Sequence, residues 1–386
     1  MNRTCAEINL DYIRHNFNIV KKNTSALVMC VVKANAYGHG ACMVSKTLQE
    51  CGADYFAVAD VMEGVELREG GITKPCLILG YSDDCQNVFE YDLIPSVFDY
   101  NSAKRLSEEA KKRNTTIKIH IALDTGMSRI GFKVNSIEDR ENSLDEILKI
   151  SLLDNIEIEG VFSHFSTADE ENDEYTRFQF NSFLSFTDEM KARGIHFDIR
   201  HICNSAATML YPDMHLEMVR PGIIIYGLNP SEYFACKNFG FIPAMEVKSI
   251  ISRVTVLDEG TFVGYGNTFR TENKTKLATV SIGYADGYFR AFSNKGYGMY
   301  KGEKIKISGR ICMDQCMFDV TNVNNISVGD HVMLFGKELS ADDIASEIGT
   351  IGYELICAVG RRVPRAYYDN GKKIEEINFI MENIVR

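Results

Sequence analysis

A lysine stands at the end of a strongly apolar run, in the segment VMCVVKANAYGHG. The hydrophobic residues before Lys33 predict a buried strand, and Gly38 and Gly40 indicate a turn after it. A lysine partly removed from water loses pKa, which makes its amine a usable nucleophile toward aldehydes. A lysine that only extends its amine to solvent is the commoner alternative. Tyr37 could offer its hydroxyl to an anion or simply pack in the loop.

Polar or charged side chains also follow several other apolar runs. They are Asp60, Arg129, His164, Asn204, Ser205 and Arg220, the last followed closely by Gly222. In barrels of parallel strands, the reactive groups come from the C-terminal ends of the strands. Such a fold needs polar loops there in any case, so each residue taken alone could be an ordinary strand-end group. Ser205 taken alone would be a helix N-cap.

The elements that position these residues form a regular alternation between residues 27 and 228. Eight apolar runs are separated by segments of helical spacing: LVMCVVKA, FAVAD, CLILG, LIPSVFD, IKIHIALD, IEGVFSHF, HICNSAA and MVRPGIIIYG. They are rich in Val and Ile and mostly not alternating, which is typical of parallel strands buried on both faces. Eight such units predict a (β/α)8 TIM barrel, assigned to residues 13–234. A doubly wound open sheet would give the same alternation.

Two helices between these runs are marked by apolar stripes. Ala41, Val44, Leu48 and Cys51 form one stripe, and Gly52 is its expected end. Phe180, Phe183, Leu184 and Thr187 form a second stripe, in a helix expected to end near Gly194.

The pattern changes after Pro230. Short β-branched segments separated by Gly, Asn and Asp predict a mostly β C-terminal domain over residues 235–386: RVTVL, KLATVSI, KIKISGRI, CMFDV and HVMLF. One helix is expected inside it, from about Ser340 to Ile348, with Ser340 as the N-cap. Residues 1–12 lie outside the barrel. There TCAEINL predicts a strand that packs with the C-terminal domain, before a helix starting at Asp11.

Length and composition narrow the classes of function. The 386 residues suggest two domains, and the net charge of −11 argues against a nucleic-acid-binding surface. The eleven cysteines form no framework, and three residues separate Cys312 from Cys316, which is not a common zinc or redox spacing. We therefore expect reduced thiols and no metal. The N-terminus lacks a signal-peptide core and no apolar run reaches membrane-spanning length, so a cytoplasmic protein is expected.

Nine segments, taken in order, resemble the alanine racemases, the fold-type-III family of pyridoxal-phosphate enzymes. They are VVKANAYGHG, LDTGMSRIGF, GVFSHFSTADE, NSAAT, MVRPGIIIYGL, GYGNTF, IGYADGY, GRICMDQ and GYELICAVGRRVPR. The resemblance covers nearly the whole chain, and nine motifs in the family's order are far more specific than one. It implies a pyridoxal-phosphate enzyme that interconverts L- and D-alanine and supplies D-alanine for peptidoglycan.

The resemblance also implies two catalytic bases. Racemisation removes the α-proton from one face and returns it to the other, so two bases on opposite faces meet the need. Lys33 matches the residue that holds the cofactor covalently and acts as one base. Tyr265 matches the other base, and its neighbours Gly264 and Gly266 give the backbone freedom to carry the phenol into a crowded site. In the family this tyrosine comes from the second subunit of a homodimer.

The cofactor and substrate positions follow from the same resemblance. The phosphate-binding positions correspond to Tyr37, Ser205, Gly222, Ile223 and Tyr353, with Asn204 counted among the cofactor residues. Arg220 matches the arginine at the pyridine nitrogen, and His164 matches its hydrogen-bond partner. A guanidinium can donate to that nitrogen without readily protonating it, which weakens the ring as an electron sink and suppresses transamination. The substrate positions correspond to Arg129, Tyr284, Met313 and Asp314.

Ala122 departs from the family pattern. Many members carry at this position a carbamylated lysine that orients the arginine matched by Arg129. The orienting anion must be absent or replaced, for example by bound chloride. We expect altered substrate affinity rather than loss of activity.

Other functions remain open at this point. Serine, or both amino acids, is the nearest alternative substrate, since one methyl-to-hydroxymethyl difference is worth only about 1–3 kcal/mol. Tyr353 should narrow the pocket toward a methyl group and favour alanine. Arg220 argues against a decarboxylase, which is better served by an acidic partner of the ring nitrogen. A non-catalytic cofactor carrier would not need the β domain with Tyr265.

Overall fold

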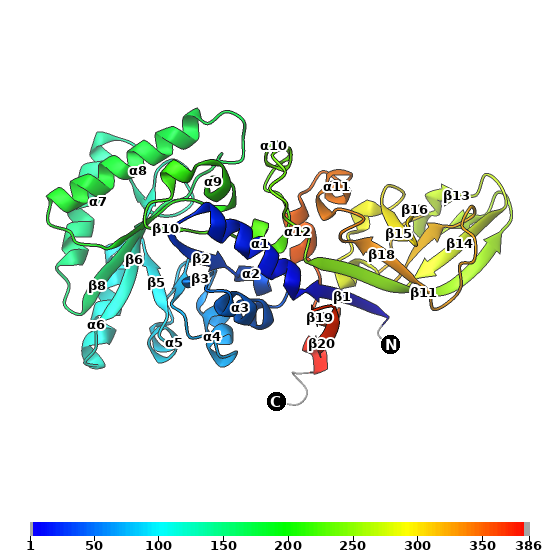
Figure 1. Cartoon of the computed structure of the whole chain (residues 1–386), viewed down its shortest axis with the longest axis horizontal. Helices are drawn as coiled ribbons and strands as arrows, with labels where there is room; N and C mark the ends of the chain where they lie inside the picture. Colours follow the sequence, from blue (N-terminus) through cyan, green and yellow to red (C-terminus); the bar gives the residue numbers. More distant parts are fainter. Residues whose placement is uncertain (1–2, 382–386) are drawn as a thin grey trace.

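The computed structural model describes residues 3–381 and shows a parallel barrel followed by a β domain (Figure 1). Residues 1–2 and 382–386 of the expected terminal segments lie outside the described part. The barrel strands are β2 Leu27–Val31, β3 Tyr55–Val58, β4 Cys76–Ile78, β5 Ile94–Val97, β6 Ile117–Asp124, β8 Ile156–Phe162, β9 Ile199–His201 and β10 Met218–Val219. All of these pairings are parallel, in the order β10-β2-β3-β4-β5-β6-β8-β9.

The last barrel strand pairs with the first, with Met218 opposite Leu27. The circle is completed beside β9, because the Arg220 amide just after β10 donates to the Cys203 carbonyl just after β9 at 2.9 Å. A doubly wound open sheet would leave its two edge strands apart, so the predicted TIM barrel is confirmed. A short strand, β7 Phe132–Lys133, pairs with β6 beside the main path.

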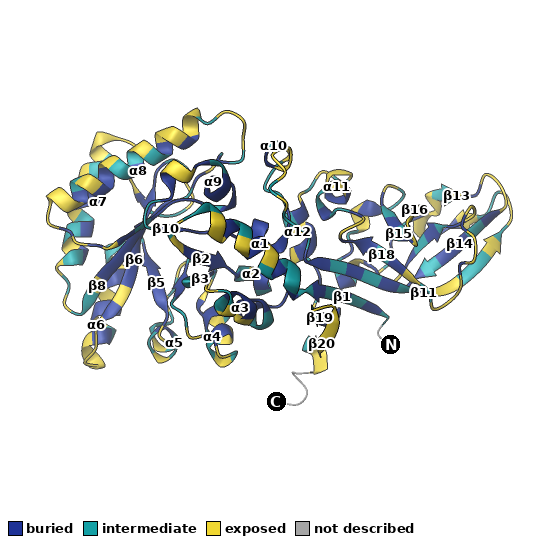
Figure 2. Cartoon of the chain, viewed as in Figure 1, coloured by how far each residue is buried: buried dark blue, intermediate teal, exposed yellow. Residues whose placement is uncertain are grey.

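Helices precede or follow the barrel strands, and the longer ones cover the barrel from outside (Figure 1). They are α1 Leu10–Asn23, α2 Lys33–Tyr37, α3 Ala41–Glu50, α4 Val61–Glu69, α5 Cys85–Glu90, α6 Tyr100–Lys112, α7 Ile137–Ser151, α8 Glu174–Ala192, α9 Ser205–Leu210 and α10 Glu232–Ala235, with 3-10 turns η1 Pro212–Met214 and η2 Ile223–Tyr226. Figure 2 shows buried barrel strands and exposed outer faces on α6, α7 and α8. The stripe predicted from Ala41 forms α3, with Cys51 as its C-cap.

Alternate residues of the strands face the barrel interior. On β6 every second residue from Ile117 to Leu123 joins the outer core, so His120 and Ala122 face inward. A separate buried apolar cluster lies among the barrel strands: Met29, Val31, Ala57, Leu77, Ile94, Ile199 and Met218.

The C-terminal domain is built on one nine-stranded sheet, which confirms its predicted β character. The order is β14-β17-β16-β15-β18-β11-β1-β19-β20. The strands are β1 Thr4–Asn9, β11 Met245–Leu257, β14 Thr275–Val280, β15 Tyr297–Tyr300, β16 Glu303–Ile307, β17 Cys316–Asp319, β18 His331–Phe335, β19 Arg365–Asp369 and β20 Lys372–Ile377, beside a hairpin of β12 Phe262–Val263 and β13 Phe269–Arg270. The remaining elements are α11 Ala341–Ser346, α12 Gly352–Cys357, η3 Tyr265–Asn267, η4 Tyr284–Asp286 and η5 Arg290–Phe292.

The N-terminal strand joins the two halves. β1 is antiparallel to β11 and parallel to β19, and the chain then enters the barrel through α1. The helix begins at Leu10, one residue before the expected start, because Asn9 caps it by accepting from the Tyr12 amide. Among the helices of residues 3–381, none is both long and apolar enough to cross a membrane.

Candidate active site

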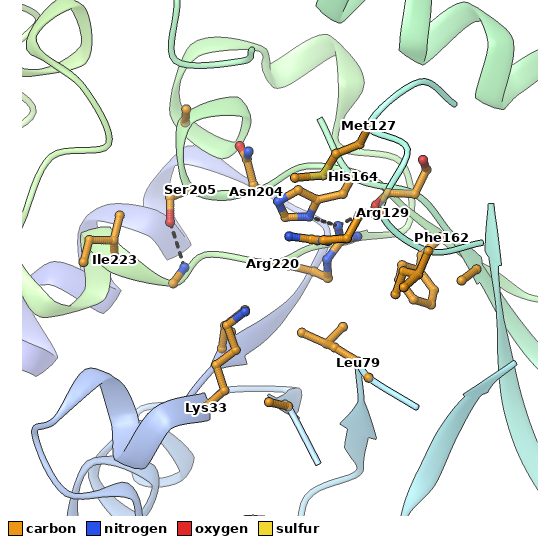
Figure 3. A pocket seen from close by; sticks show the side chains of 18 of the residues that line it. Lys33, Leu79, Met127, Arg129, Phe162, His164, Asn204, Ser205, Arg220 and Ile223 are labelled. Carbon is orange, nitrogen blue, oxygen red and sulfur yellow. Dashed lines mark hydrogen bonds between the residues drawn. The ribbon is translucent and has the colours of Figure 1, made fainter. Parts of the chain in front are cut away.

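A cavity of about 520 Å³ lies at the C-terminal ends of the barrel strands. Ten of the residues singled out from the sequence line it: Lys33, Tyr37, Arg129, His164, Asn204, Ser205, Arg220, Gly222, Ile223 and Tyr353. Figure 3 shows Lys33 and Arg220 reaching into the same space from different strands, with Ser205 and Ile223 at one side. The structure therefore gathers residues that are up to 320 positions apart (353 − 33) in the chain.

Lys33 is presented by an unusual turn. Residues 34–37 all have positive φ, between 51° and 54°, so the expected loop is a left-handed turn without glycine. The carboxylate of Glu63 holds its start by accepting from the Ala34 amide at 2.6 Å, while His39 Nδ1 donates to the carbonyl of Tyr37 at 3.0 Å. Because such a conformation is strained, it persists only where neighbours hold it. The result is that Lys33 and Tyr37 line one cavity.

The environment of Lys33 favours the neutral amine. Burial lowers the pKa of Lys33 below its ordinary value, and the positive charges of Arg129 and Arg220 lower it further, against the opposing charge of Glu63. A lysine that only extends into water would keep its ordinary pKa. This amine is therefore suited to react with an aldehyde.

Hydroxyl groups collect on one side of the cavity. Ser205 Oγ accepts from the Gly222 amide at 2.8 Å. The N-cap of α9 is Asn204, which accepts from the Ala207 amide, so the interpretation of Ser205 as an N-cap is wrong. A Cβ atom on Gly222 would lie 2.8 Å from the hydroxyl of Tyr37, so a side chain there would enter the space beside that phenol.

Two phenols complete this side. The rings of Tyr37 and Tyr353 lie with centroids 6.2 Å apart. Burial raises the pKa of both phenols, so both stay protonated and can donate hydrogen bonds. Together with Ser205 they offer neutral polar groups rather than charge.

Arg220 is buried, with 3% of its surface exposed. It donates to the Ser163 carbonyl at 2.6 Å, to His164 Nδ1 at 3.1 Å and to His201 Nδ1 at 2.8 Å. Burial lowers the pKa of Arg220 to about 10, which leaves the guanidinium charged at neutral pH. Burial and the charge of Arg220 lower the pKa of His164 well below its usual value, so that ring is neutral. Among the described residues, no carboxylate forms an ion pair with Arg220.

Arg129 lines the cavity and is exposed. The carboxylate of Asp124 shapes the turn before it, accepting from the amides of Gly126 and Ser128 at 2.9 Å each. Ala122 is buried and lines the same cavity. No acidic side chain within residues 3–381 forms an ion pair with Arg129, so its fork remains available for a carboxylate ligand.

Four of the site residues that the family resemblance implied do not line this cavity. Tyr265 lies in η3, between the strands of the β12–β13 hairpin, and is 69% exposed. Tyr284, Met313 and Asp314 lie close together on another part of the β domain, where the Tyr284 amide donates to the carbonyl of Cys312 at 3.1 Å. All four are exposed.

One candidate from the sequence has only a structural role in the fold. Two residues that contact the site were not among the candidates. Asp60 caps α4 by accepting from the Glu63 amide. The two are Glu63, which accepts from the first amide of the turn after Lys33, and His201, which accepts from Arg220. A histidine inside the apolar run HICNSAA was a signal for the second, whereas nothing local marks Glu63.

The donor set fits pyridoxal phosphate. The cofactor needs an amine for its aldehyde, neutral donors for its phosphate and a partner for its ring nitrogen, and Lys33, the hydroxyl side and Arg220 meet these needs. Across the described chain, no three His, Cys, Asp or Glu side chains form a group that could hold a metal ion. A barrel that carries such a lysine at its mouth, followed by a β sheet, belongs to the barrel-type pyridoxal-phosphate enzymes.

Comparison with known proteins identifies the family. The models for the alanine racemase N-terminal and C-terminal domains match residues 8–230 and 244–367. The chain belongs to the alanine racemase family, whose members are pyridoxal-phosphate-dependent racemases.

Individual relatives are similar over nearly their whole length. Alanine racemase 1 of Clostridium acetobutylicum is 44% identical over 382 residues, covering 97% of this chain and 98% of the relative. The solved alanine racemase of Clostridium difficile 630 is 40% identical with a TM-score of 0.94, over 98% of this chain and 99% of that one. That of Bacillus anthracis with bound L-Ala-P is 34% identical with a TM-score of 0.91, over 99% of both chains.

Proposed function

We propose that this chain interconverts L- and D-alanine with pyridoxal phosphate, as a homodimer whose two active sites each combine Lys33 of one subunit with Tyr265 of the other. One observation carries the proposal. The partly buried amine of Lys33, with its lowered pKa, shares a cavity with a charged arginine, Arg220, that forms no ion pair with a carboxylate among residues 3–381.

The first half of each site is complete in one chain. When bound, pyridoxal phosphate withdraws electrons from the α-carbon of an amino acid and so acidifies its α-hydrogen. Tyr37, Ser205, Gly222, Ile223 and Tyr353 would hold its phosphate, with Asn204 supporting the turn. Arg220, braced by His164, would donate a hydrogen bond to the ring nitrogen and keep its own proton. Lys33 moves a proton at the α-carbon on one face.

The second half must come from elsewhere. Racemisation needs a base on the opposite face. The phenols of Tyr37 and Tyr353 that line the cavity would hold the phosphate, and His164 accepts from Arg220, so these groups have other roles. Tyr265 is exposed on a glycine-flanked turn, and Tyr284, Met313 and Asp314 are exposed as well. A symmetric dimer that brings these four residues over the partner's cavity supplies the base and closes the substrate pocket.

Alanine is the favoured substrate. Arg129 offers a fork for the carboxylate. The half-buried phenol of Tyr353 lines the cavity, where it would narrow the space for the substrate side chain toward a methyl group. The related enzyme of Bacillus anthracis was solved with L-Ala-P bound. The product would supply D-alanine for peptidoglycan, and the eleven free thiols suit the reducing cytoplasm.

The test is direct. Purified holoenzyme given L-alanine should produce D-alanine until the two enantiomers are equal, as measured by chiral chromatography, and its mass in sedimentation should be that of a dimer. L-serine should react with a kcat/KM lower by about 10–200-fold, the factor that corresponds to about 1–3 kcal/mol. No D-alanine from a cofactor-loaded protein contradicts the proposal, and faster turnover of serine contradicts its substrate.

A further inference from the structure

A chain of hydrogen bonds crosses the barrel interior beneath Arg220. Nη1 of Arg220 meets His201 Nδ1 at 2.8 Å, and His201 Nε2 meets His120 Nδ1 at 2.8 Å. His120 Nε2 then meets Glu159 Oε2 at 3.1 Å, and the other oxygen of Glu159 accepts from Lys118 Nζ at 2.7 Å. Three strands, β6, β8 and β9, and the residue that follows β10 contribute to this row of hydrogen-bonded side chains, which runs from the cavity to the other end of β6.

The chemistry of the two end groups sets the direction of every bond. Arginine can only donate, so Nδ1 of His201 must accept and its Nε2 must carry the hydrogen. His120 then accepts at Nδ1 and carries its hydrogen on Nε2. An ionised carboxylate can only accept, so Glu159 receives that last hydrogen. Both histidines are thereby fixed as Nε2–H tautomers.

The charge states agree with this assignment. Burial lowers the pKa of His120 and, with the charge of Arg220, that of His201, so both rings are neutral near neutral pH. Burial alone would raise the pKa of Glu159, but hydrogen bonds from His120 and Lys118 outweigh it and lower the pKa to about 2. Neutral imidazoles therefore separate a fixed cation from a fixed anion.

The barrel interior has space for this row of hydrogen-bonded side chains because one strand residue beside it is a glycine. A Cβ atom on Gly160 would lie 2.6 Å from Cε1 of His120, so the ring occupies the space that a side chain would fill. The register between β6 and β8 shifts between Ile119 and His120, which brings His120 opposite Gly160. His120 and His201 are fully buried, and Phe162 stacks on His201 with centroids 5.1 Å apart.

We propose that Glu159 is a positioning residue for the racemase reaction, because its acceptor-only carboxylate fixes the tautomers of His120 and His201 and thereby the orientation of Arg220 in the cavity. This inference rests on the proposed function and deepens it. If the side chain at position 159 can donate, the hydrogen bonds from residue 159 through His120 to His201 can reverse their direction. His201 would then present an N–H to Arg220, and two donors facing each other would displace the guanidinium.

The substitution Glu159→Gln isolates the direction of the bonds, because it keeps the shape and allows donation. Glu159→Asp is the opposite case, since it shortens the side chain but leaves an acceptor-only carboxylate. The matched control is Glu157→Gln on the same strand, whose carboxylate lies 3.9 Å from Lys118 and is half exposed. A role confined to packing predicts that Asp is worse than Gln, whereas the proposal predicts the reverse.

The tautomers can be measured without turnover. Holoenzyme labelled with 15N-histidine should show His120 and His201 as Nε2–H tautomers in the wild type and in Glu157→Gln. In Glu159→Gln, the signal of at least one of these two histidines should report the other tautomer or a mixture of both tautomers. A wild-type His201 that carries its hydrogen on Nδ1 overturns the proposal, even if every variant fails to fold.

The kinetic outcome is equally specific. Loss of an outer partner that orients an active-site group costs about 10–100-fold by analogy with metal-binding histidines. Glu159→Gln should lower kcat for alanine by about that factor, with KM changed much less, and Glu159→Asp should retain more activity than Glu159→Gln. A Gln variant as active as Glu157→Gln, or an Asp variant slower than Gln, overturns the proposal. An inactive wild type contradicts the proposed function instead.

Discussion

Arg365 Nε donates to the carbonyl of Gly38 at 3.0 Å, which ties the first residue of β19 to the turn that presents Lys33. The contact is tight from a second direction, because a Cβ atom on Gly38 would lie 2.2 Å from the carbonyl oxygen of Ile356 in α12. The C-terminal domain therefore forms the wall behind the left-handed turn. This explains how a strained backbone without glycine at positions 34–37 can be held in place.

Replacing Arg365 by lysine tests this wall. Arg365 is 1% exposed and also donates to the carbonyls of Val359, Gly360 and Val363 at 2.6 Å each. A lysine lacks the forked guanidinium and cannot donate to all four carbonyls, so some of these buried carbonyl oxygens lose their hydrogen-bond donor. We expect a loss of about 2–4 kcal/mol in the free energy of unfolding, measured in urea, and weaker cofactor binding. The exposed Arg361→Lys is the control, and equal stability of the two variants would show that the wall is not needed.

The fold was largely predictable because both its periodicities are visible in the sequence. Each of the eight apolar runs overlaps one barrel strand, although HICNSAA shares only His201 with β9 and MVRPGIIIYG only its first two residues with β10. The segment HVMLF became β18 with the same bounds. The missed elements are short and depend on tertiary contacts. No sequence signal marked α12 or β15 Tyr297–Tyr300, which has Gly298 in its centre. The helix predicted to reach Ile348 ends at Ser346, because the Ala345 carbonyl accepts from the amides of Ile348 and Thr350 and so closes the last turn.

The sequence was sufficient to predict the position of those site residues that directly follow a barrel strand. Lys33, His164 and Arg220 all follow barrel strands, so closing the barrel brings them together. The left-handed turn could not be predicted, since nothing in ANAY requires positive φ. The link from Arg220 to Glu159 was also hidden, because it depends on which strand faces which and on a register shift.

Lys33→Ala should abolish covalent attachment of the cofactor. Borohydride followed by denaturation should leave pyridoxal phosphate on the wild type and on the exposed control Lys46→Ala, but not on this variant. Racemisation should fall by at least about 10²–10⁴-fold, the usual contribution of one acid–base group. Because the pKa of Lys33 is lowered, more of its amine is neutral near pH 7 than in a surface lysine. Attachment that persists in Lys33→Ala, seen by mass spectrometry, contradicts the role of this amine.

Tyr265→Phe should separate proton exchange from inversion. With one base lost, Lys33 can still remove and return a proton on its own face, so one enantiomer of alanine should exchange its α-hydrogen in D₂O with retained configuration. Inversion should slow by about 10²–10⁴-fold. The control is Tyr233→Phe. NMR follows the exchange. If both enantiomers lose α-hydrogen exchange equally, the phenol supports folding or binding and is not the base for one face.

Ala122→Lys should change the affinity for alanine. The position is 1% exposed and lines the cavity with Arg129, so a lysine amine there would meet the arginine directly unless it is carbamylated. We expect a change in KM of about 3–30-fold, corresponding to roughly 1–2 kcal/mol, with kcat changed less. Assays with and without bicarbonate measure the contribution of carbamylation. Unchanged kinetics in both conditions would show that no orienting anion acts at this position.

The central claim is that Lys33 and Tyr265 of one active site come from different subunits, and heterodimers purified through two tags test it most directly. A dimer of one Lys33→Ala chain and one Tyr265→Phe chain should have one intact site and about half the wild-type activity. A dimer of one wild-type chain and one chain with both substitutions should be inactive, since each site then lacks one base. The opposite pattern, with activity only in the second heterodimer, would contradict the shared site.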